Sequence, residues 1–355
     1  MKIKRIIAII TAVLLVASQA AFAATAEFKD MPDNWSTEAL QKAVDNGLLG
    51  GSDGYIYPDD YMTRAEMATI MARACGAVEE ADISQYTDVS VDDWYYSSMA
   101  KAVAMKAFTG SDNQLNPDNY ITRQEAFVVL ARVFSLNLDK NIDETVIDDF
   151  KDGNKVASWA RKEVAAVIGG GFVSGSDGYV NPENNISRAE FAVVMNRLVA
   201  HYIDDATVTE IPETGNVMIR VGGITLDGLK GDRMIIVGDG VGKTEVNIKN
   251  ADLTGRFVVR GGETVNLEGA LDEIRIIMPY ITVDRSKASS AGIYVCENSV
   301  INIGTITSPD MSAIEEMPEV DVTEDENATT EEISPDKTEI ITEPVEEEIV
   351  ENIAE

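Results

Sequence analysis

Three arginines occupy the same place in a repeated four-residue motif and are the side chains best suited to bind an anion. The motif is Thr63-Arg64-Ala65-Glu66, and it recurs at 122–125 and 187–190. The repeat arginines are Arg64, Arg123 and Arg188. A cation at the start of a helix faces the positive end of the helix dipole, at a cost of about 0.3 to 1 kcal/mol. Its recurrence suggests that each arginine holds an anion together with free helix amides. The alternative is ion pairing with a nearby carboxylate, from the set Asp59, Asp60, Asp118 and Glu183.

The other positions of the motif are explained by helix capping. A hydroxyl at the N-cap accepts a hydrogen bond from the third helical amide, and the glutamate at that third position reaches back to the N-cap amide. The capping residues are Thr63 and Glu66, Thr122 and Glu125, and Ser187 and Glu190. Capping leaves only the arginine without a structural role.

A tryptophan stands 29 residues before each of these arginines. The repeat tryptophans are Trp35, Trp94 and Trp159. Aromatic faces stack on sugar rings, but a tryptophan that opens an amphipathic helix is more often a packing residue. We therefore expect these side chains to pack, with room for partial exposure, and we retain them as candidate glycan-binding residues.

A glycine-rich loop begins 13 residues before each arginine, as in Gly51-Ser52-Asp53-Gly54. Such loops resemble calcium loops, but they lack the closing carboxylate of an EF-hand, so we expect them to form turns. The loop serines, retained as candidate glycan contacts, are Ser52, Ser111 and Ser176. We expect no catalytic residue, no metal site and no cofactor.

These motifs lie in three helix, loop, helix units whose apolar residues recur at helical spacing. The predicted repeats span 27–80, 86–138 and 147–203. Because two short helices bury little surface alone, we expect the units to pack around a shared core as an all-α, three-repeat helical bundle.

The units resemble the S-layer homology domain. Each contains the tryptophan-led helix, the glycine-rich loop, the Thr-Arg-Ala-Glu type motif and an aromatic-x-Asp opening. The openings are Phe28-Lys29-Asp30, Tyr86-Thr87-Asp88 and Phe150-Lys151-Asp152. The resemblance implies a pseudo-threefold module that binds secondary cell-wall polysaccharide, often pyruvylated, in grooves between repeats. It also implies that the repeat arginines contact the acidic glycan.

Composition excludes several other classes of protein. The 355 residues include 61 acidic and 29 basic side chains, a balance that excludes a general nucleic-acid binder. His201 is the only histidine, which removes most catalytic triads and histidine metal sites. Cys75 and Cys296 are predicted to lie in different domains, so they imply no disulfide framework.

The N-terminus predicts export. Basic residues precede an apolar run that ends in Ala21-Phe22-Ala23, which is typical of a signal peptide of residues 1–23. An uncleaved membrane anchor is the alternative. No later segment is apolar enough to span a bilayer, so we expect no membrane span in the mature chain.

The period of the pattern changes after a predicted linker at 204–215. Residues 216–307 contain short apolar-polar-apolar strands, such as Val246-Asn247-Ile248, at a spacing of roughly 20 residues. This spacing favours a small all-β domain built as a parallel β-solenoid, with a β-sandwich as the alternative. Gly242-Lys243-Thr244 lacks the spacing of a phosphate-binding loop. Several carboxylates lie in the predicted turns and could serve an enzyme: Asp227, Asp232, Asp239, Asp252, Asp272 and Glu273.

Residues 308–355 carry 18 acidic side chains and only Lys337, a net charge of −17 out of −32, and predict a disordered acidic tail. The whole sequence thus predicts a secreted, non-catalytic protein of the cell wall or cell surface, anchored to polysaccharide or to peptidoglycan-linked glycan. The alternatives are an envelope glycan-modifying enzyme and self-association through the β-rich domain.

Overall fold

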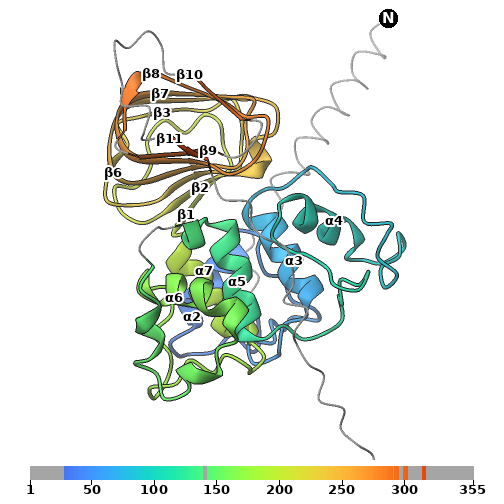
Figure 1. The fold of residues 1–355 in the computed structure, drawn as a ribbon. Helices are drawn as coiled ribbons and strands as arrows, with labels where there is room; N and C mark the ends of the chain where they lie inside the picture. The colour runs from blue at the N-terminus through green and yellow to red at the C-terminus, as the bar shows by residue number, and fades with distance from the viewer. Residues whose placement is uncertain (1–27, 139–141, 291, 296–298, 303–313, 317–355) are drawn as a thin grey trace, which may run out of the picture. The chain divides into compact units, whose positions relative to one another are not determined.

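The computed structural model describes residues 28–138, 142–290, 292–295, 299–302 and 314–316 (Figure 1). The predicted signal peptide lies outside the described residues, as does the predicted tail apart from one short strand. Among the described residues, no helix is both long enough and apolar enough to cross a membrane. Residues 28–316 fall within one compact unit.

Among the described residues, six α-helices form the three repeats, two in each (Figure 1). Their bounds are α2 (Thr37–Asp45), α3 (Arg64–Ala74), α4 (Tyr96–Ala104), α5 (Arg123–Val133), α6 (Arg161–Gly169) and α7 (Arg188–Leu198). The second helices, α3, α5 and α7, are buried along most of their length, because apolar residues occupy nearly every face. Residues from all three repeats contribute to one hydrophobic core.

The repeats also contain short extended segments, so they are not purely helical. The segment before each second helix pairs with the corresponding segment of another repeat, through the bridges Tyr61 to Ser187, Thr63 to Tyr120 and Thr122 to Asn185. These bridges close a ring in which every repeat touches the other two.

The glycine-rich loops are hairpin turns. Ser52 pairs with Tyr55, and the residues between them, Asp53 and Gly54, both have positive φ, as a type I′ turn requires. The same geometry occurs at Ser111 to Gln114 and at Ser176 to Tyr179. The loops therefore form turns.

The second part of the chain is a parallel β-solenoid (Figure 1). Its strands are β1 (His201–Ile203), β2 (Val217–Ile219), β3 (Thr225–Asp227), β4 (Lys230–Gly231), β5 (Ile235–Val237), β6 (Glu245–Val259), β7 (Thr264–Ile276), β8 (Thr282–Ser289), β9 (Gly292–Val295), β10 (Val300–Asn302) and β11 (Ile314–Glu316). All pairings between these strands are parallel, which confirms the solenoid and excludes the sandwich. β1 lies within the range predicted for the third repeat, so the sheet begins before the predicted linker.

One face of the solenoid is buried against the helices. Alternate residues of a strand point to opposite faces, so Val217 and Ile219 fill the solenoid interior while Met218 between them joins the helical core. Ile236 and Val258 of the neighbouring strands do the same as Met218. Burial on both faces explains why these strands are continuous apolar runs rather than alternating ones.

Polar side chains from this face cap the C-terminal ends of the helices. Last-turn carbonyls lack partners within their own helix, so donors from elsewhere must satisfy them. The bonds run from Arg220 to the carbonyls of Asn46 and Arg73, from Arg260 to those of Met105 and Val133, and from Asn216 to that of Leu198. Each of α3, α5 and α7 is thereby held at its C-terminal end by a solenoid side chain.

The glycine-rich turn at 238–242 lets the solenoid backbone approach the end of α3 closely. The amide of Gly240 donates to the carbonyl of Cys75 at 2.8 Å, just past the end of α3. A Cβ at Gly238 would lie 2.8 Å from that carbonyl oxygen, and one at Gly240 would lie 2.7 Å from the carbonyl oxygen of Gly76. The segment that superficially resembles a phosphate loop is therefore a docking turn for a helix end.

Candidate functional site

The repeat arginines lie at the first position of α3, α5 and α7, at the junctions between repeats. Each Nε donates to the carbonyl of a residue just after the hairpin turn of the next repeat, with the third repeat followed by the first. The bonds, all 2.9 Å, run from Arg64 to Leu115, from Arg123 to Val180 and from Arg188 to Ile56. Every repeat is thus tied to its successor through the same side chain.

The same arginines form ion pairs with the capping glutamates, which are Glu66, Glu125 and Glu190. Nη1 of Arg64 lies 3.4 Å from Glu125, Nη1 of Arg123 lies 2.8 Å from Glu190, and Nη1 of Arg188 lies 3.3 Å from Glu66. The three arginine side chains are only 16%, 10% and 10% exposed, in that order. The structure therefore accounts for each arginine without an external anion. The alternative of pairing with Asp59, Asp60, Asp118 or Glu183 names the wrong carboxylates, because the partner comes from the capping box of the next repeat.

The amides at the helix N-termini are not free either. All three second helices have the complete capping box, in which Thr63, for example, accepts from Glu66 and donates its own amide to that carboxylate. The amides of Arg64 and Ala65 donate to the carbonyls of Asn119 and Pro117 at 2.9 Å, and α5 and α7 repeat this pattern. The expectation of free amides for an anion is wrong, because loop carbonyls of the next repeat use them.

Burial affects the electrostatics of these junctions. Desolvation lowers the pKa of Arg64, opposed by the nearby charges of Glu125 and Asp88. The pKa of Arg123 is lowered for the same reason, opposed by Glu190 and Asp152. Removing the carboxylate partner would leave a poorly hydrated cation at each junction.

The aspartates of the aromatic-x-Asp openings hold the loops in place, a role that the sequence analysis does not predict. The carboxylate of Asp30 accepts from the amides of Ile56 and Tyr57 at 2.7 and 2.8 Å. Asp88 and Asp152 make the equivalent bonds in their repeats. The carbonyl of Ile56, which shares a peptide group with the amide of Tyr57, accepts a hydrogen bond from Arg188. The aspartates therefore position the carbonyls that the arginines bind.

The repeat tryptophans are exposed. Trp35, Trp94 and Trp159 are 65%, 67% and 52% exposed, so the expectation that they pack is wrong. Each precedes the first helix of its repeat, where Ala39 and Leu40 rather than the indole of Trp35 enter the core. Trp94 touches Tyr95 edge to face, with ring centroids 5.4 Å apart. In the described part of the chain, no tryptophan ring stacks on an arginine.

The loop serines serve the hairpins through their backbones. Ser52 and Ser176 are exposed and Ser111 is half-buried, and each pairs across its turn with the residue three positions on. The structure leaves the hydroxyls of Ser111 and Ser176 without a hydrogen bond among the described residues, while that of Ser52 lies 3.4 Å from the hydroxyl of Tyr57.

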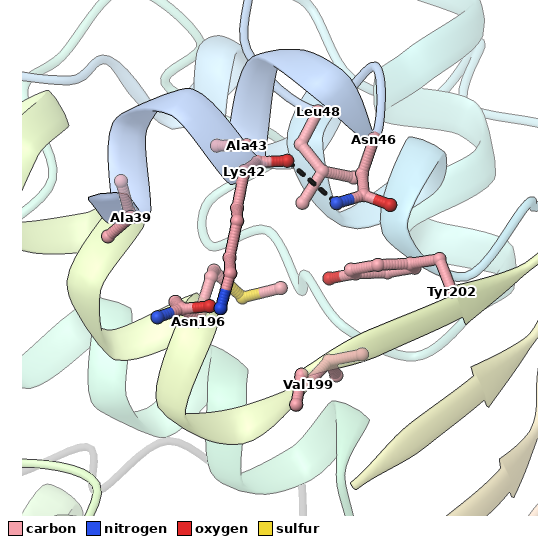
Figure 2. Close-up of a pocket in the computed structure, with 11 residues that line it drawn as sticks. Ala39, Lys42, Ala43, Asn46, Leu48, Asn196, Val199 and Tyr202 are labelled. Atoms are coloured by element: carbon pink, nitrogen blue, oxygen red, sulfur yellow. Dashed lines mark hydrogen bonds between the residues drawn. The ribbon is translucent and has the colours of Figure 1, made fainter. Parts of the chain in front are cut away.

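A small pocket lies between α2 and α7, next to β1 (Figure 2). Figure 2 shows the hydroxyl of Tyr202 pointing into it, near the side chain of Asn46. That hydroxyl is buried without a hydrogen-bond partner, and burial raises the pKa of Tyr202. The pocket has a volume of about 10 Å³, enough for one water molecule but not for a sugar.

A much larger cleft, of about 970 Å³, lies between the third repeat and the solenoid. Three of the carboxylates singled out in the sequence line it: Asp232, Asp272 and Glu273. Glu273 forms ion pairs with Arg256 at 3.3 Å and with Arg275. Glu273 therefore has two internal partners.

The described residues were also compared with the ligand sets that metal ions require. Across the described ranges, no group of three or more histidine, cysteine, aspartate or glutamate side chains is placed to hold a metal ion. Cys75 is fully buried, and desolvation raises the pKa of its thiol to about 12, so it is a structural rather than a reactive cysteine.

Comparison with known proteins identifies the repeats. The family model of the S-layer homology domain matches residues 27–68, 85–127 and 149–192. The chain is similar to a surface-layer 125 kDa protein of Lysinibacillus sphaericus, with 28% identity over 81% of this chain and 25% of that protein. It is also similar to the S-layer protein sap of Bacillus anthracis, with 26% identity over 48% of this chain and 21% of the relative.

Enzymes are among the similar proteins as well. The exoglucanase XynX of Acetivibrio thermocellus is 25% identical over 48% of this chain and 16% of its own length. The chain spans a quarter or less of the length of these three relatives. The chain carries three S-layer homology domains.

Proposed function

We propose that the chain anchors itself to the cell envelope by non-covalent binding of its three repeats to an acidic cell-wall polysaccharide, including pyruvylated forms. The observation that carries the proposal is the exposure of the repeat tryptophans. An exposed indole adds nothing to the core, yet the same exposure recurs at three equivalent positions. Flat aromatic faces presented to solvent suit stacking on sugar rings.

The arginines contribute to this site in a second way. Their Nε and Nη1 atoms hold the repeats together, and Nη2 of Arg64 and Arg123 makes no hydrogen bond among the described residues. Those nitrogens are donors for a carboxylate on the glycan. The loop serines supply neutral hydroxyls for the sugar.

The protein is secreted and associated with the cell surface or cell wall. The S-layer homology domains and the S-layer relatives support this location. In this proposal the β-solenoid is displayed from the repeats, and its surface is a candidate for self-association.

Sedimentation with purified cell-wall sacculi tests the proposal. We expect the full chain to sediment with sacculi that retain their polysaccharide and to stay in solution when the polysaccharide has been removed. The variant Trp35→Ala/Trp94→Ala/Trp159→Ala is expected to stay in solution in both cases, with an unchanged melting temperature. Tyr280→Ala is the matched control, since Tyr280 is an 80% exposed aromatic in the solenoid. Full binding by the triple variant, or equal binding to both kinds of sacculi, would contradict the proposal.

The second candidate function is an envelope glycan-modifying enzyme that the repeats target to the wall, and the large cleft is the observation behind it. Asp232 and Asp272 are the solenoid carboxylates of the cleft for which no ion pair is seen in the described part of the chain. An acid and a base are the minimum that glycoside hydrolysis requires. Release of reducing sugar from sacculi, lost in Asp232→Asn and Asp272→Asn but kept in Asp252→Asn, would establish this function. No release by the unmodified chain would reject it.

A further inference from the structure

We propose that the large cleft between the third repeat and the solenoid binds an extended, uncharged glycan chain. This ligand class differs from the acidic polysaccharide proposed for the repeats. Among the described residues that line the cleft, none is a repeat tryptophan or a repeat arginine. The two sites are therefore separate, and binding in the cleft does not require that the repeats bind acidic polysaccharide. It also does not require that the cleft carboxylates catalyse a reaction.

The two walls of the cleft differ in chemistry. The wall formed by the helical repeats is largely apolar and includes Ile142, Val146 and Phe172. The wall formed by the solenoid presents mainly carboxylate, hydroxyl and guanidinium groups, together with the ring of Tyr294. A pyranose ring has apolar C–H faces and hydroxyl groups along its edge, so it can contact both walls at once. The volume of about 970 Å³ is at the upper end of the range for ligand sites, which favours several linked sugars over one.

Polar side chains of the solenoid wall are stacked in a column. Leu253 of β6 is in register with Gly231 of β4 and with Leu271 of β7. The next residue along the chain from each of these is exposed and lines the cleft. These three residues, the cleft column, are Asp232, Thr254 and Asp272. Neighbouring strands are about 4.8 Å apart, so the column offers one carboxylate or hydroxyl per rung along the solenoid axis. Such an array suits a ligand that repeats along its length.

The charges of the cleft favour an uncharged ligand. Four carboxylates and two guanidinium groups line it, those of Asp143, Asp232, Asp272, Glu273, Arg233 and Arg256. Both arginines have internal partners, because Arg256 pairs with Glu273 and Arg233 donates from Nε to the carbonyl of Lys230 at 2.9 Å. The remaining carboxylates disfavour an acidic glycan through like-charge repulsion. They are acceptors for the hydroxyl groups of a neutral one.

Glycines keep the cleft open on both walls. Gly169 is the last residue of α6, and Gly292 is the first residue of β9. Among the described residues, nothing lies within 4 Å of a Cβ built at Gly169, and a Cβ at Gly292 would meet Tyr294 and Glu273 only at 3.9 and 4.0 Å. Neither glycine has a positive φ. A larger side chain is therefore compatible with the fold at both positions, but it would occupy the cleft.

A glycan array of neutral and acidic oligosaccharides, matched in length and probed with the full chain, tests the proposal. We expect the unmodified chain to bind linear neutral oligosaccharides, more tightly as they lengthen from disaccharides upward. Gly292→Leu and Gly169→Leu should each abolish this binding from opposite walls, with unchanged melting temperatures. If the unmodified chain binds no neutral oligosaccharide, or if both glycine variants bind as it does, the proposal is overturned.

The cleft column is tested by removing its carboxylates. Asp232→Ala and Asp272→Ala each remove one charged acceptor of a hydrogen bond, which should weaken binding of the neutral oligosaccharide roughly tenfold. Asp252→Ala is the matched control, since Asp252 is an exposed carboxylate of β6 outside the cleft lining. The control should bind as the unmodified chain does. Equal weakening in all three variants would overturn the assignment to the column.

The repeat tryptophans separate this proposal from the anchoring function. Trp35→Ala/Trp94→Ala/Trp159→Ala should keep full binding to neutral oligosaccharides while it loses binding to acidic polysaccharide. Loss of neutral binding in this variant would place the neutral glycan on the repeats and overturn the proposal. Failure of the unmodified chain to bind acidic polysaccharide, with neutral binding intact, would reject only the proposed function.

Discussion

The two ends of the second helices are stabilised by different means. At the N-terminal ends, the donors and acceptors come from the next repeat, and the same residue types recur at α3, α5 and α7. At the C-terminal ends, the donors come from the solenoid, and they are an arginine at α3 and α5 but an asparagine at α7. The first network was copied with the repeat, whereas the second was built once, between two unlike partners.

The two networks respond differently to the loss of one side chain. The N-terminal contacts are three parallel versions of one arrangement, so loss of one leaves two intact. The C-terminal contacts converge on few side chains, and Arg260 alone serves the ends of α4 and α5 while pairing with Asp239. The solenoid is therefore part of the folded core that supports the repeats.

Arg260→Ala should cause the largest loss of stability. Arg260 is almost fully buried, and its Nε lies 2.6 Å from the carboxylate of Asp239. Removing one partner of a buried ion pair leaves the other charge unpaired, at a cost of about 3 to 5 kcal/mol. Chemical denaturation of the full chain measures this cost. Arg197→Ala, which removes an exposed arginine, is the control. An equal loss of stability in the two variants would contradict the claim that the C-terminal ends depend on Arg260.

Glu190→Gln should have a smaller effect. It neutralises the partner of Arg123 but keeps an amide oxygen for the capping box, so about 1 to 2 kcal/mol of stability should be lost. Glu66→Gln and Glu125→Gln should cost similar amounts, since the arrangement is repeated. Glu183→Gln, at an exposed acidic side chain, is the control. Effects that differ widely among the three would contradict the view of three equivalent contacts.

The pH dependence of stability tests whether Cys75, just past the C-terminal end of α3, is buried by the solenoid. Burial raises the pKa of this thiol from 9.0 to about 12 in the folded chain. The unfolded chain therefore releases the proton first, and the stability contribution is complete below pH 9 and lost as the pH rises toward 12. We expect the unmodified chain to lose about 1.4 kcal/mol per pH unit more than Cys75→Ala across this window. Parallel curves for the two proteins would show that the thiol is not buried in this way.

Tyr202→Phe should have the smallest effect. The hydroxyl of Tyr202 is buried without a hydrogen-bond partner beside the small pocket at the end of α2. Its removal sacrifices no protein hydrogen bond, so the free energy of unfolding should change by less than about 0.5 kcal/mol or increase slightly. Tyr202→Ala, which also removes the ring, is the contrasting change. A loss above 1 kcal/mol in Tyr202→Phe would mean that the hydroxyl has a partner in solution.

The sequence predicts the local features well and the long-range ones poorly. The capping boxes and the parallel solenoid follow from residues close together in the chain. The partner of Arg64 does not, because Glu125 lies 61 residues away and its role depends on how the repeats close into a ring. A capping glutamate can serve two partners at once, and a motif viewed within its own repeat cannot reveal the second.

The prediction that the tryptophans pack is wrong for a related reason. A residue just before an amphipathic helix lies at the border between the buried and exposed faces, and its type does not decide which it joins. Only the packed structure shows that Ala39 and Leu40 fill the core beneath Trp35. The burial of these side chains is therefore the reverse of the sequence prediction: the arginines are largely buried with internal partners, and the indoles are exposed.

Tryptophan fluorescence of the unmodified chain tests this reversal most directly. The chain has three tryptophans, and all of them are repeat tryptophans, so the signal reports only on the proposed site. Before addition of polysaccharide, the emission should be that of exposed indole and should be quenched by iodide. On addition of soluble wall polysaccharide, we expect a shift to shorter wavelength and protection from iodide. Binding of the polysaccharide without any change in emission or quenching would contradict the account.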